Sequence, residues 1–539
     1  MQKIVAAFII LLSLITGLLQ AQTLDYRFVV VGCNRVNPGD APGPSTANVY
    51  HLNRTFLEVS QLSPLPKYFF FAGDLIDGVG GSNDTAGLLS EYTGWKQLYA
   101  NSSLSDSGVQ MVTIMGNHES ESSDNSLAYP AAERTFIRNM SEFIIGNNGP
   151  KALGLTAGTD SLITDQSQLT YSFNYKNLST KNDHFVIINT DAVGRDWKAP
   201  FVWVNNDVTA ARQASSTRHI FVMGHKPAYP SPITPTDGLV MYPYQRNMFW
   251  NALQNNRAEA MFAAHNHNWD TVHYNYNQPA LSTWQVIAGN GGSPISGAWS
   301  DPYYGYTVVN VYTNGQVTVQ NYGRDINPNA YTASIPTVLT TLKGTFNITW
   351  PTTITHTPIA NSQANGPFTG SATIIDNDSV YSAYVIYSVN GGAKQDTINL
   401  TDSANVYKFT IPAQADTGAG YIEYKIIANG STVASYPTAS TATTFAFNGA
   451  LAVIPPLPSA TDIKVYPNPT TGTLTIDLSS HKGITSITFQ NINGIGLKNI
   501  TNINSSIITT DISSLPPGTY FMLFTNVAGQ QFVKKIIKN

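Results

Sequence analysis

The sequence predicts an α/β domain followed by two all-β domains, and three observations indicate this architecture. Up to about Arg324, buried-strand patterns alternate with helical patterns, which is typical of a mainly parallel sheet with helices outside it. After Arg324 the helical periodicity ends, and short alternating strands separated by Gly and Asn turns follow. The length of 539 residues exceeds that of one domain and suggests about three or four.

The α/β region, 24–324, begins with the strand "YRFVVV" and continues through clear alternation. A helix is predicted over 47–62, where Val49, Leu52, Phe56 and Val59 have helical spacing. The region closes with a hairpin over 304–323, whose turn is Asn314-Gly315. Further helices are expected at 88–100, 205–214 and 244–254, and further strands at 67–73, 109–116, 184–191, 218–225 and 258–265.

The remainder of the chain is predicted to consist of β domains joined by linkers. Residues 325–345 form a linker, and the short strands of 346–448 indicate a β-sandwich of immunoglobulin type. A second linker, 449–461, is stiffened by proline and precedes the last β-rich block, 462–539.

The bulk composition limits where the chain acts and what it binds. Residues 1–21 combine a basic start, an apolar run and a small residue suited to cleavage, which predicts a signal peptide. No second apolar run is long enough to span a membrane, so no transmembrane segment is expected in the mature chain. The net charge of −4 gives no basic footprint for nucleic acid, and the single cysteine, Cys33, excludes an intramolecular disulfide.

Side chains of metal-ligand type follow four of the predicted strands where the apolar run ends. The carboxyl ends of strands in an α/β sheet converge on one crevice, so these residues can share one metal site. Each motif alone is weak, and their joint occurrence indicates the site. The residues are Asp74 and Asp77 in "GDLID", Asn117, His118 and Glu119 in "GNHE", His225 in "GHKP", and His265 and His267 in "AHNH".

The same motifs in the same order make residues 24–324 resemble the calcineurin-like metallophosphoesterase family, which includes the purple acid phosphatases. The family pattern runs from GDxxD or GDxxY through GNH(D/E) and a later histidine to GHxH, and these motifs depart from it only at Ala264. The resemblance implies an α/β/β/α sandwich, one or two metal ions (Zn, Fe or Mn), and phosphoester hydrolysis by metal-activated water.

The resemblance also implies the metal ligands and one catalytic residue. His118 would bind no metal and would face the substrate as a proton donor or phosphate contact. The metal ligands would be Asp74 as the bridge between the two metals, His267 for the first metal, and Asn117, His225 and His265 for the second.

The first motif departs from the family pattern, because Cys33 and Arg35 stand where an aspartate ligand and often a histidine are expected. Three interpretations stay open. The Cys33 thiolate binds the first metal, or the first position is empty and Arg35 supplies positive charge toward a substrate phosphate, or Cys33 is buried and inert. Asp77, at the position of the purple phosphatases' tyrosine ligand, would compensate in each.

The last block, 462–539, resembles the C-terminal sorting domain of the type IX secretion system. The motifs "YPNPTTG" (466–472), "LPPGTYF" (515–521) and the basic end "KKIIKN" occur in order at the end of the chain. The resemblance implies the type IX secretion machinery as a partner, and a chain that is secreted or attached to the outer cell surface.

The leading expectation is a secreted phosphoesterase that acts on phosphate monoesters, with a phosphorylated small molecule or another phosphate ester as substrate. A phosphodiesterase or nucleotidase is the first alternative, since the same metal site serves these reactions. A surface binding protein with a decayed phosphoesterase domain is the second, because Cys33 and Arg35 depart from the pattern. The central β-sandwich carries no cluster of titratable residues, which indicates a spacer.

Overall fold

The computed structural model of the chain falls into two compact units. The first contains Met1–Ile354, Ile374–Ala383 and Ala428–Ala434, and the second contains Thr355–Thr373, Tyr384–Ile427 and Ser435–Asn539. The predicted signal peptide (1–21) and the linker 449–461 lie outside the described residues. The structure describes residues 23–37, 49–78, 85–122, 124, 126–151, 154, 158–230, 238–277, 281–294, 303–325, 339–392, 396–403, 405–414, 419–438, 442–447, 463–479, 483–491, 496–501, 503, 505–526 and 531–539.

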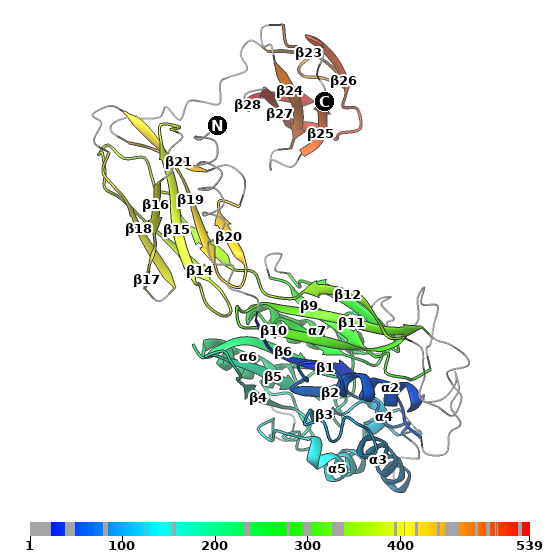
Figure 1. The fold of residues 1–539 in the computed structure, drawn as a ribbon. Coiled ribbons are helices and arrows are strands. Elements are labelled where there is room, and N and C mark those ends of the chain that lie inside the picture. Colours follow the sequence, from blue (N-terminus) through cyan, green and yellow to red (C-terminus); the bar gives the residue numbers. More distant parts are fainter. Residues whose placement is uncertain are drawn as a thin grey trace. The chain divides into compact units, whose positions relative to one another are not determined.

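Two six-stranded sheets form the centre of the first unit (Figure 1). The strands of the first sheet are β1 (Leu24–Val31), β2 (Tyr68–Ala72), β3 (Gln110–Ile114), β10 (Tyr303–Tyr312), β11 (Val317–Asp325) and β12 (Thr341–Asn347). The strands of the second sheet are β4 (Tyr171–Tyr175), β5 (Asn182–Ile187), β6 (Thr217–Met223), β7 (Ala260–Ala263), β8 (Trp269–Tyr274) and β9 (Thr283–Ala288).

Both sheets are mixed, although the strands that precede the candidate ligands are parallel. The strand orders are β12-β11-β10-β1-β2-β3 and β4-β5-β6-β7-β9-β8. The β1, β2 and β3 strands pair in parallel, as do β5, β6, β7 and β9. The prediction of a mainly parallel sheet is therefore wrong for the first sheet, in which the hairpin β10–β11 lies antiparallel to β1 and β12 pairs antiparallel with β11. In the second sheet only the edge strands β4 and β8 pair antiparallel.

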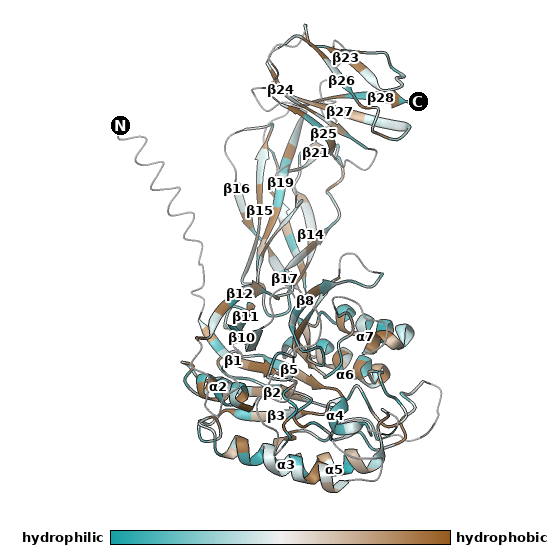
Figure 2. Ribbon diagram, turned by 90° about the vertical axis from the view of Figure 1, so that its right-hand side faces the viewer, coloured by the Kyte–Doolittle hydropathy of each residue, from teal (hydrophilic) through white to brown (hydrophobic). Residues whose placement is uncertain are grey.

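The two sheets pack face to face with helices on their outer sides, which confirms the α/β/β/α arrangement. Alternate residues of β1 face different layers: Phe28 meets Phe185 of the second sheet at a ring-centroid distance of 5.4 Å, whereas Val29 belongs to the outer, helix-covered cluster. Figure 2 shows apolar colour along β1 and its neighbours, and both colours on α3 and α5. The helices are α2 (Val49–Ser60), α3 (Thr85–Ala100), α4 (Asn117–Ser120), α5 (Pro130–Met140), α6 (Phe201–Gln213) and α7 (Pro243–Asn255), with 3₁₀ turns η1 (Ser141–Phe143) and η2 (Leu239–Met241).

The first unit extends beyond the boundary expected from the sequence. Strand β12 begins within the region expected to be linker, ends two residues beyond it, and pairs antiparallel with β11. Ile348, just after it, is buried in the cluster between the two sheets. The alternating pattern of this segment indicates a strand but does not tell which sheet it joins, so the sandwich was expected to begin too early.

Two further sheets follow β12 and form the predicted β-sandwich. Phe368 of one sheet meets Phe445 of the other at a ring-centroid distance of 4.9 Å, so apolar side chains join the two layers. One sheet consists of β13 (Thr353–His356), β14 (Phe368–Ile375), β17 (Thr401–Ser403) and β18 (Val406–Ile411). The other consists of β15 (Ser382–Val389), β16 (Asp396–Asn399), β19 (Gly420–Asn429), β20 (Val433–Tyr436) and β21 (Thr443–Phe447).

The last 77 residues that the structure describes in part, from Ile463 onward, have an apolar cluster of their own. Its members, among them Ile476, Phe489 and Phe524, all come from this block. A three-stranded sheet contains β22 (Lys464–Tyr466), β23 (Thr473–Asp477) and β26 (Ile507–Asp511). A four-stranded sheet contains β24 (Ile484–Gln490), β25 (Gly496–Thr501), β27 (Gly518–Asn526) and β28 (Gln531–Lys538). Across the described part of the chain, no helix combines the length and apolarity that crossing a membrane requires.

Candidate metal centre

The candidate ligands lie where the parallel strands of the two sheets end. In the first sheet, Cys33, Asp74 and Asn117 follow the neighbouring strands β1, β2 and β3. In the second sheet, His225 and His265 follow the neighbouring strands β6 and β7. The strand ends of both sheets therefore contribute side chains to one site, as carboxyl ends in α/β folds commonly do.

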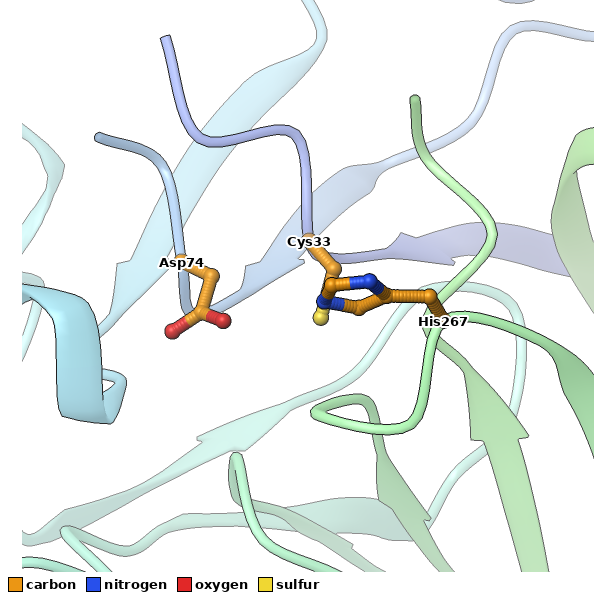
Figure 3. A group of neighbouring side chains, drawn as sticks. All are labelled: Cys33, Asp74 and His267. Atoms are coloured by element: carbon orange, nitrogen blue, oxygen red, sulfur yellow. The ribbon is translucent and has the colours of Figure 1, made fainter. Parts of the chain in front are cut away.

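Two groups of potential metal ligands share the Asp74 carboxylate. The first group is Cys33, Asp74 and His267, and the second is Asp74, His225 and His265; in each, one ligand atom per residue lies within 4.8 Å of the others. Figure 3 shows that the three side chains of the first group come from separate chain segments and point into one space. The structure thus brings together residues that are up to 234 positions apart, the span from Cys33 to His267.

The second group brings ring nitrogens of His225 and His265 close to carboxylate and amide oxygens. The Nε2 atom of His225 lies 3.0 Å from Asp74 Oδ1 and 3.0 Å from Asn117 Oδ1, and the Nδ1 atom of His265 lies 3.0 Å from the same amide oxygen. The other ring nitrogen of His225 donates to the Ala72 carbonyl oxygen at 2.7 Å. This leaves Nε2 directed at two oxygens, where either a proton or a cation has to sit.

The electrostatics of the second group favour positive charge. Burial alone would raise the pKa of the Asp74 carboxyl, but His225, His118 and Arg35 hold it well below its usual range. Burial tends to lower the pKa of His225, and Asp74 nevertheless raises it. A carboxylate oxygen, an amide oxygen and two imidazole nitrogens are ligands that suit Zn, Fe or Mn. The residues of this group therefore fit a metal ion.

The first group contains a histidine nitrogen without a hydrogen-bond partner. His267 is 7% exposed, and its Nδ1 donates to the Pro294 carbonyl oxygen at 2.6 Å, while its Nε2 has no partner among the described residues. Burial and then Arg35 lower the pKa of His267 to about 4, so the ring is neutral near pH 7. A neutral imidazole with a free, buried Nε2 fits a metal ion, since Nε2 holds a lone pair directed into the group.

Cys33 completes the first group and is fully buried. Its sulfur accepts a hydrogen bond from the His265 peptide N–H at 3.0 Å. Burial, followed by the charge of Asp74, raises the pKa of the Cys33 thiol well above its usual value. A cation in this group would act in the opposite direction, because a nearby positive charge favours the thiolate.

Several residues of the site have the left-handed backbone conformation that residues other than glycine rarely adopt. The φ angles are 59° for Cys33, 61° for Arg35, 55° for Asp74 and 62° for His265. Such conformations persist only where the surrounding structure enforces them, and they cluster at functional sites. Here they turn the chain sharply after β1, β2 and β7, so that side chains of ligand type face the shared space.

Glycine allows the segments of the site to approach closely at two positions. Gly73 has a φ of 84°, and a Cβ atom there would lie 2.4 Å from His225 Nδ1. A Cβ atom at Gly116 would lie 2.5 Å from the Asp74 amide nitrogen. The glycines of the "GDLID" and "GNHE" motifs are therefore required by packing around Asp74.

His118 and Asp77 are joined through the backbone. The Nδ1 atom of His118 donates to the Asp77 carbonyl oxygen, which leaves Nε2 directed away from that contact. The Asp77 carboxylate belongs to neither ligand group that the described residues form. The main chain of Asp77 orients His118, and a compensating role for the Asp77 carboxylate stays a prediction.

Arg35 lies beside the shared carboxylate. Its Nε atom is 3.4 Å from Asp74 Oδ2, and its side chain remains 24% exposed while Asp74 is fully buried. Arg35 therefore brings a positive charge to the edge of the site that solvent can reach, which is where an anionic ligand would approach.

Glu119 has a role that the sequence did not reveal. Its buried carboxylate accepts hydrogen bonds from the peptide N–H groups of Asp74, Leu75, Ile76 and Gly116, at 2.6–3.1 Å. It thereby joins the loop after β2 to the loop after β3. Burial and the Asp74 charge raise the pKa of Glu119 to about 7, although four N–H donors directed at it suit the ionised form. In the sequence, the acidic residue of the "GNHE" motif was the only feature that pointed to this role of Glu119.

Replacing Glu119 with alanine should destabilise the first unit and weaken metal binding. The change leaves four buried peptide N–H groups without their acceptor, and each such loss costs about 1–3 kcal/mol where water cannot replace it. Urea unfolding and metal titration would measure both effects. Glu121→Ala is the matched control: it removes one partner of Lys226, which keeps its 2.8 Å contact with Asp191, so we expect a much smaller loss. Equal stability of the two variants would contradict the role given to Glu119.

Comparison with known proteins identifies two parts of the chain. Residues 27–269 match the calcineurin-like phosphoesterase family, and residues 464–539 match the secretion system C-terminal sorting domain. Among curated proteins, no match to the chain was found.

Two solved structures are similar to the chain. A purple acid phosphatase from yellow lupin (Lupinus luteus) seeds has 13% identity and a TM-score of 0.39, and the match covers 60% of this chain and 54% of that one. A Staphylococcus aureus protein assigned as a 5′-nucleotidase has 12% identity and a TM-score of 0.32, with coverages of 53% and 51%. This chain therefore spans about half the length of either structure.

The two family matches agree with both resemblances noted in the sequence. Calcineurin-like phosphoesterases use a dinuclear metal centre, and the chain offers two candidate ligand groups. The sorting domain indicates export by type IX secretion to the cell surface or the extracellular space. Residues 27–269 thus match the calcineurin-like phosphoesterase family, in a chain whose residues 464–539 match a secretion-system C-terminal sorting domain.

Proposed function

We propose that the chain is an exported, metal-dependent phosphoesterase that hydrolyses phosphate monoesters. The proposal depends on one observation: the two ligand groups share Asp74. His118 lies beside them, because its peptide N–H donates to Asp74 Oδ1 at 3.3 Å. A decayed domain would have no reason to keep this geometry intact, so we favour an active enzyme over a surface binding protein.

Two metal ions would be held by two sets of residues that share Asp74. Asp74 would contact both ions, and His267 would contact the first. Asn117, His225 and His265 would complete the second position. Bound there, two ions supply Lewis acidity, an attacking water of lowered pKa, and a clamp on both oxygens of an in-line displacement.

His118 would donate the proton that the leaving oxygen needs. The Asp77 carbonyl fixes the ring through Nδ1, so the proton for the leaving alkoxide would be carried on Nε2. His118 is only partly buried, and this leaves room for a substrate to reach it.

Arg35 favours a monoester over a diester in this proposal. A phosphate monoester carries two negative charges near neutral pH and a diester carries one, since the second phosphate pKa is about 6. The partly exposed guanidinium beside Asp74 would contact a terminal phosphate oxygen that only the monoester has in ionised form.

The substrate preference is tested with matched ester pairs, such as p-nitrophenyl phosphate and bis(p-nitrophenyl) phosphate. We expect the full chain to prefer the monoester, and Arg35→Gln to lower monoester hydrolysis more than diester hydrolysis. Arg35→Lys, which keeps the charge, should lose less. A wild-type preference for diesters would favour a phosphodiesterase, and hydrolysis of neither ester would favour a binding protein.

Deleting the chain from Asp462 onward should leave hydrolysis by the purified protein unchanged but block its delivery to the cell surface. The deleted block has its own apolar cluster and contributes no residue to either ligand group. Fractionation of the native cells and ester hydrolysis by the purified truncated protein measure the two effects. Surface delivery without this block, or loss of hydrolysis in the purified truncated protein, would contradict a pure sorting role.

A further inference from the structure

We propose that Cys33 provides a thiolate ligand to the first metal position and makes this position select zinc or cobalt over manganese. The inference rests on the proposed function, since it assigns the metal class of the same site. It concerns the position at which this chain departs from the family pattern.

The backbone around Cys33 aims its sulfur into the site. The Cys33 N–H donates to the Gly73 carbonyl oxygen at 3.0 Å, and the Cys33 carbonyl oxygen accepts from the Ser293 N–H at 2.8 Å. These bonds join the Cys33 loop to the loop that carries Asp74 and to the segment after β9. They also enforce the φ of 59° at Cys33.

The atoms around the sulfur are those of a ligand set. The sulfur lies in one group with an Asp74 oxygen and a His267 nitrogen, all within 4.8 Å. The His267 Nε2 atom is buried and has no hydrogen-bond partner among the described residues. The sulfur also accepts the His265 peptide N–H at 3.0 Å, and a thiolate accepts such a bond better than a thiol does. A cation would be stabilised here by a buried nitrogen lone pair, a carboxylate and a sulfur that accepts a hydrogen bond.

The two other interpretations of Cys33 fit the structure less well. An inert cysteine is usually surrounded by apolar groups, and Cys33 does border the apolar cluster between the sheets, but its sulfur is directed at polar ligand atoms. Arg35 contacts Asp74 Oδ2 at 3.4 Å, and its side chain remains 24% exposed, whereas the ligand-type atoms of Cys33, Asp74 and His267 lie within 4.8 Å of one another. The buried group therefore offers a cation three ligand-type atoms, and Arg35 approaches it only through Asp74.

The sulfur changes the metal that the position prefers. Thiolate ligands favour zinc and similar borderline ions, whereas carboxylates suit the harder manganese and magnesium ions. The second group contains only oxygen and nitrogen ligands from Asp74, Asn117, His225 and His265. The two positions should therefore differ in selectivity, with the first retaining zinc or cobalt when manganese competes.

Cobalt(II) spectroscopy tests directly whether the Cys33 thiolate binds metal, because Cys33 is the sole cysteine of the chain. The purified full chain is stripped of metal and titrated with cobalt(II) alone. A thiolate ligand gives a sulfur-to-cobalt charge-transfer band in the near ultraviolet, and any such band can come only from Cys33. We expect the wild type to bind about two cobalt ions per chain, in line with a two-metal site, and to show the band.

Four variants show which of the two metal positions gives the charge-transfer band. Cys33→Ser should lose the band and one cobalt ion, whereas Cys33→Asp should lose the band but keep both ions and accept manganese more readily. His267→Ala should weaken or abolish the band. The matched control is Asn117→Ala, which removes a ligand of the second position, so the band should remain.

The outcomes separate this inference from the proposed function. Cobalt binding by the wild type without the band, or an unchanged cobalt content in Cys33→Ser, would overturn the thiolate ligand even if the protein hydrolyses phosphate esters. The band in a protein that hydrolyses none of the esters would support the ligand and count against the proposed function alone. Failure of the wild type to bind cobalt would overturn the inference.

Discussion

Replacing His118 with alanine should lower phosphoester turnover by about 10²–10⁴-fold while the protein keeps its metal, because positioned general-acid catalysis typically contributes that much. His118 belongs to neither ligand group, and its ring is oriented by the Asp77 carbonyl oxygen. Steady-state kinetics and elemental analysis of the same preparation measure the two quantities.

The loss in His118→Ala should depend on the leaving group. Esters of acidic alcohols need little protonation on departure, so the variant should lose less turnover with them than with alkyl esters. His273→Ala is the matched control, since His273 is an exposed histidine of β8 that stacks on Trp284 and joins neither group. Loss of metal in His118→Ala would move this residue into the ligand set and contradict its assignment as proton donor.

Replacing Asp74 with alanine should abolish hydrolysis and release bound metal from both positions. Asp74 is the one residue that both ligand groups share, and it is fully buried. Metal that binds only the folded state adds to stability by mass action, about 2.7 kcal/mol at a free concentration of 100 times its dissociation constant. The variant should therefore lose the rise in thermal stability that added zinc gives the wild type.

Thermal unfolding with and without zinc measures this effect, and elemental analysis counts the ions. His225→Ala is an informative companion, because His225 belongs to the second group only. That variant should keep one ion and part of the zinc-dependent stabilisation. An Asp74→Ala protein with its full metal content would show that the carboxylate does not bridge the two positions.

The positions of the candidate ligand residues could be predicted because each follows an apolar strand. The order of the motifs placed Asp74, Asn117, His225 and His265 at strand ends, and parallel pairing brings such ends together. The grouping of His267 with Asp74 followed from the family resemblance, since spacing along the sequence does not tell which metal position a histidine faces.

Other features depend on contacts that no local pattern encodes. The edge pairing of β12 with β11 and the face-to-face packing of two mixed sheets arise from long-range pairing. The contacts of Glu119 with peptide N–H groups of two loops, and of Asp77 through its carbonyl, involve backbone atoms, which every residue possesses. The surroundings of the Cys33 sulfur also depend on long-range contacts, so the sequence left three interpretations of this residue open.

Metal removal from the purified full chain tests most directly whether the two strand-end groups form a catalytic metal centre. The protein would be assayed with phosphate monoesters before chelation, after chelation, and after zinc or manganese is returned, with metal content measured at each stage. We expect about two ions per chain, loss of hydrolysis together with the metal, and recovery when metal is restored. Hydrolysis that persists in the metal-free protein would contradict a catalytic role for this centre.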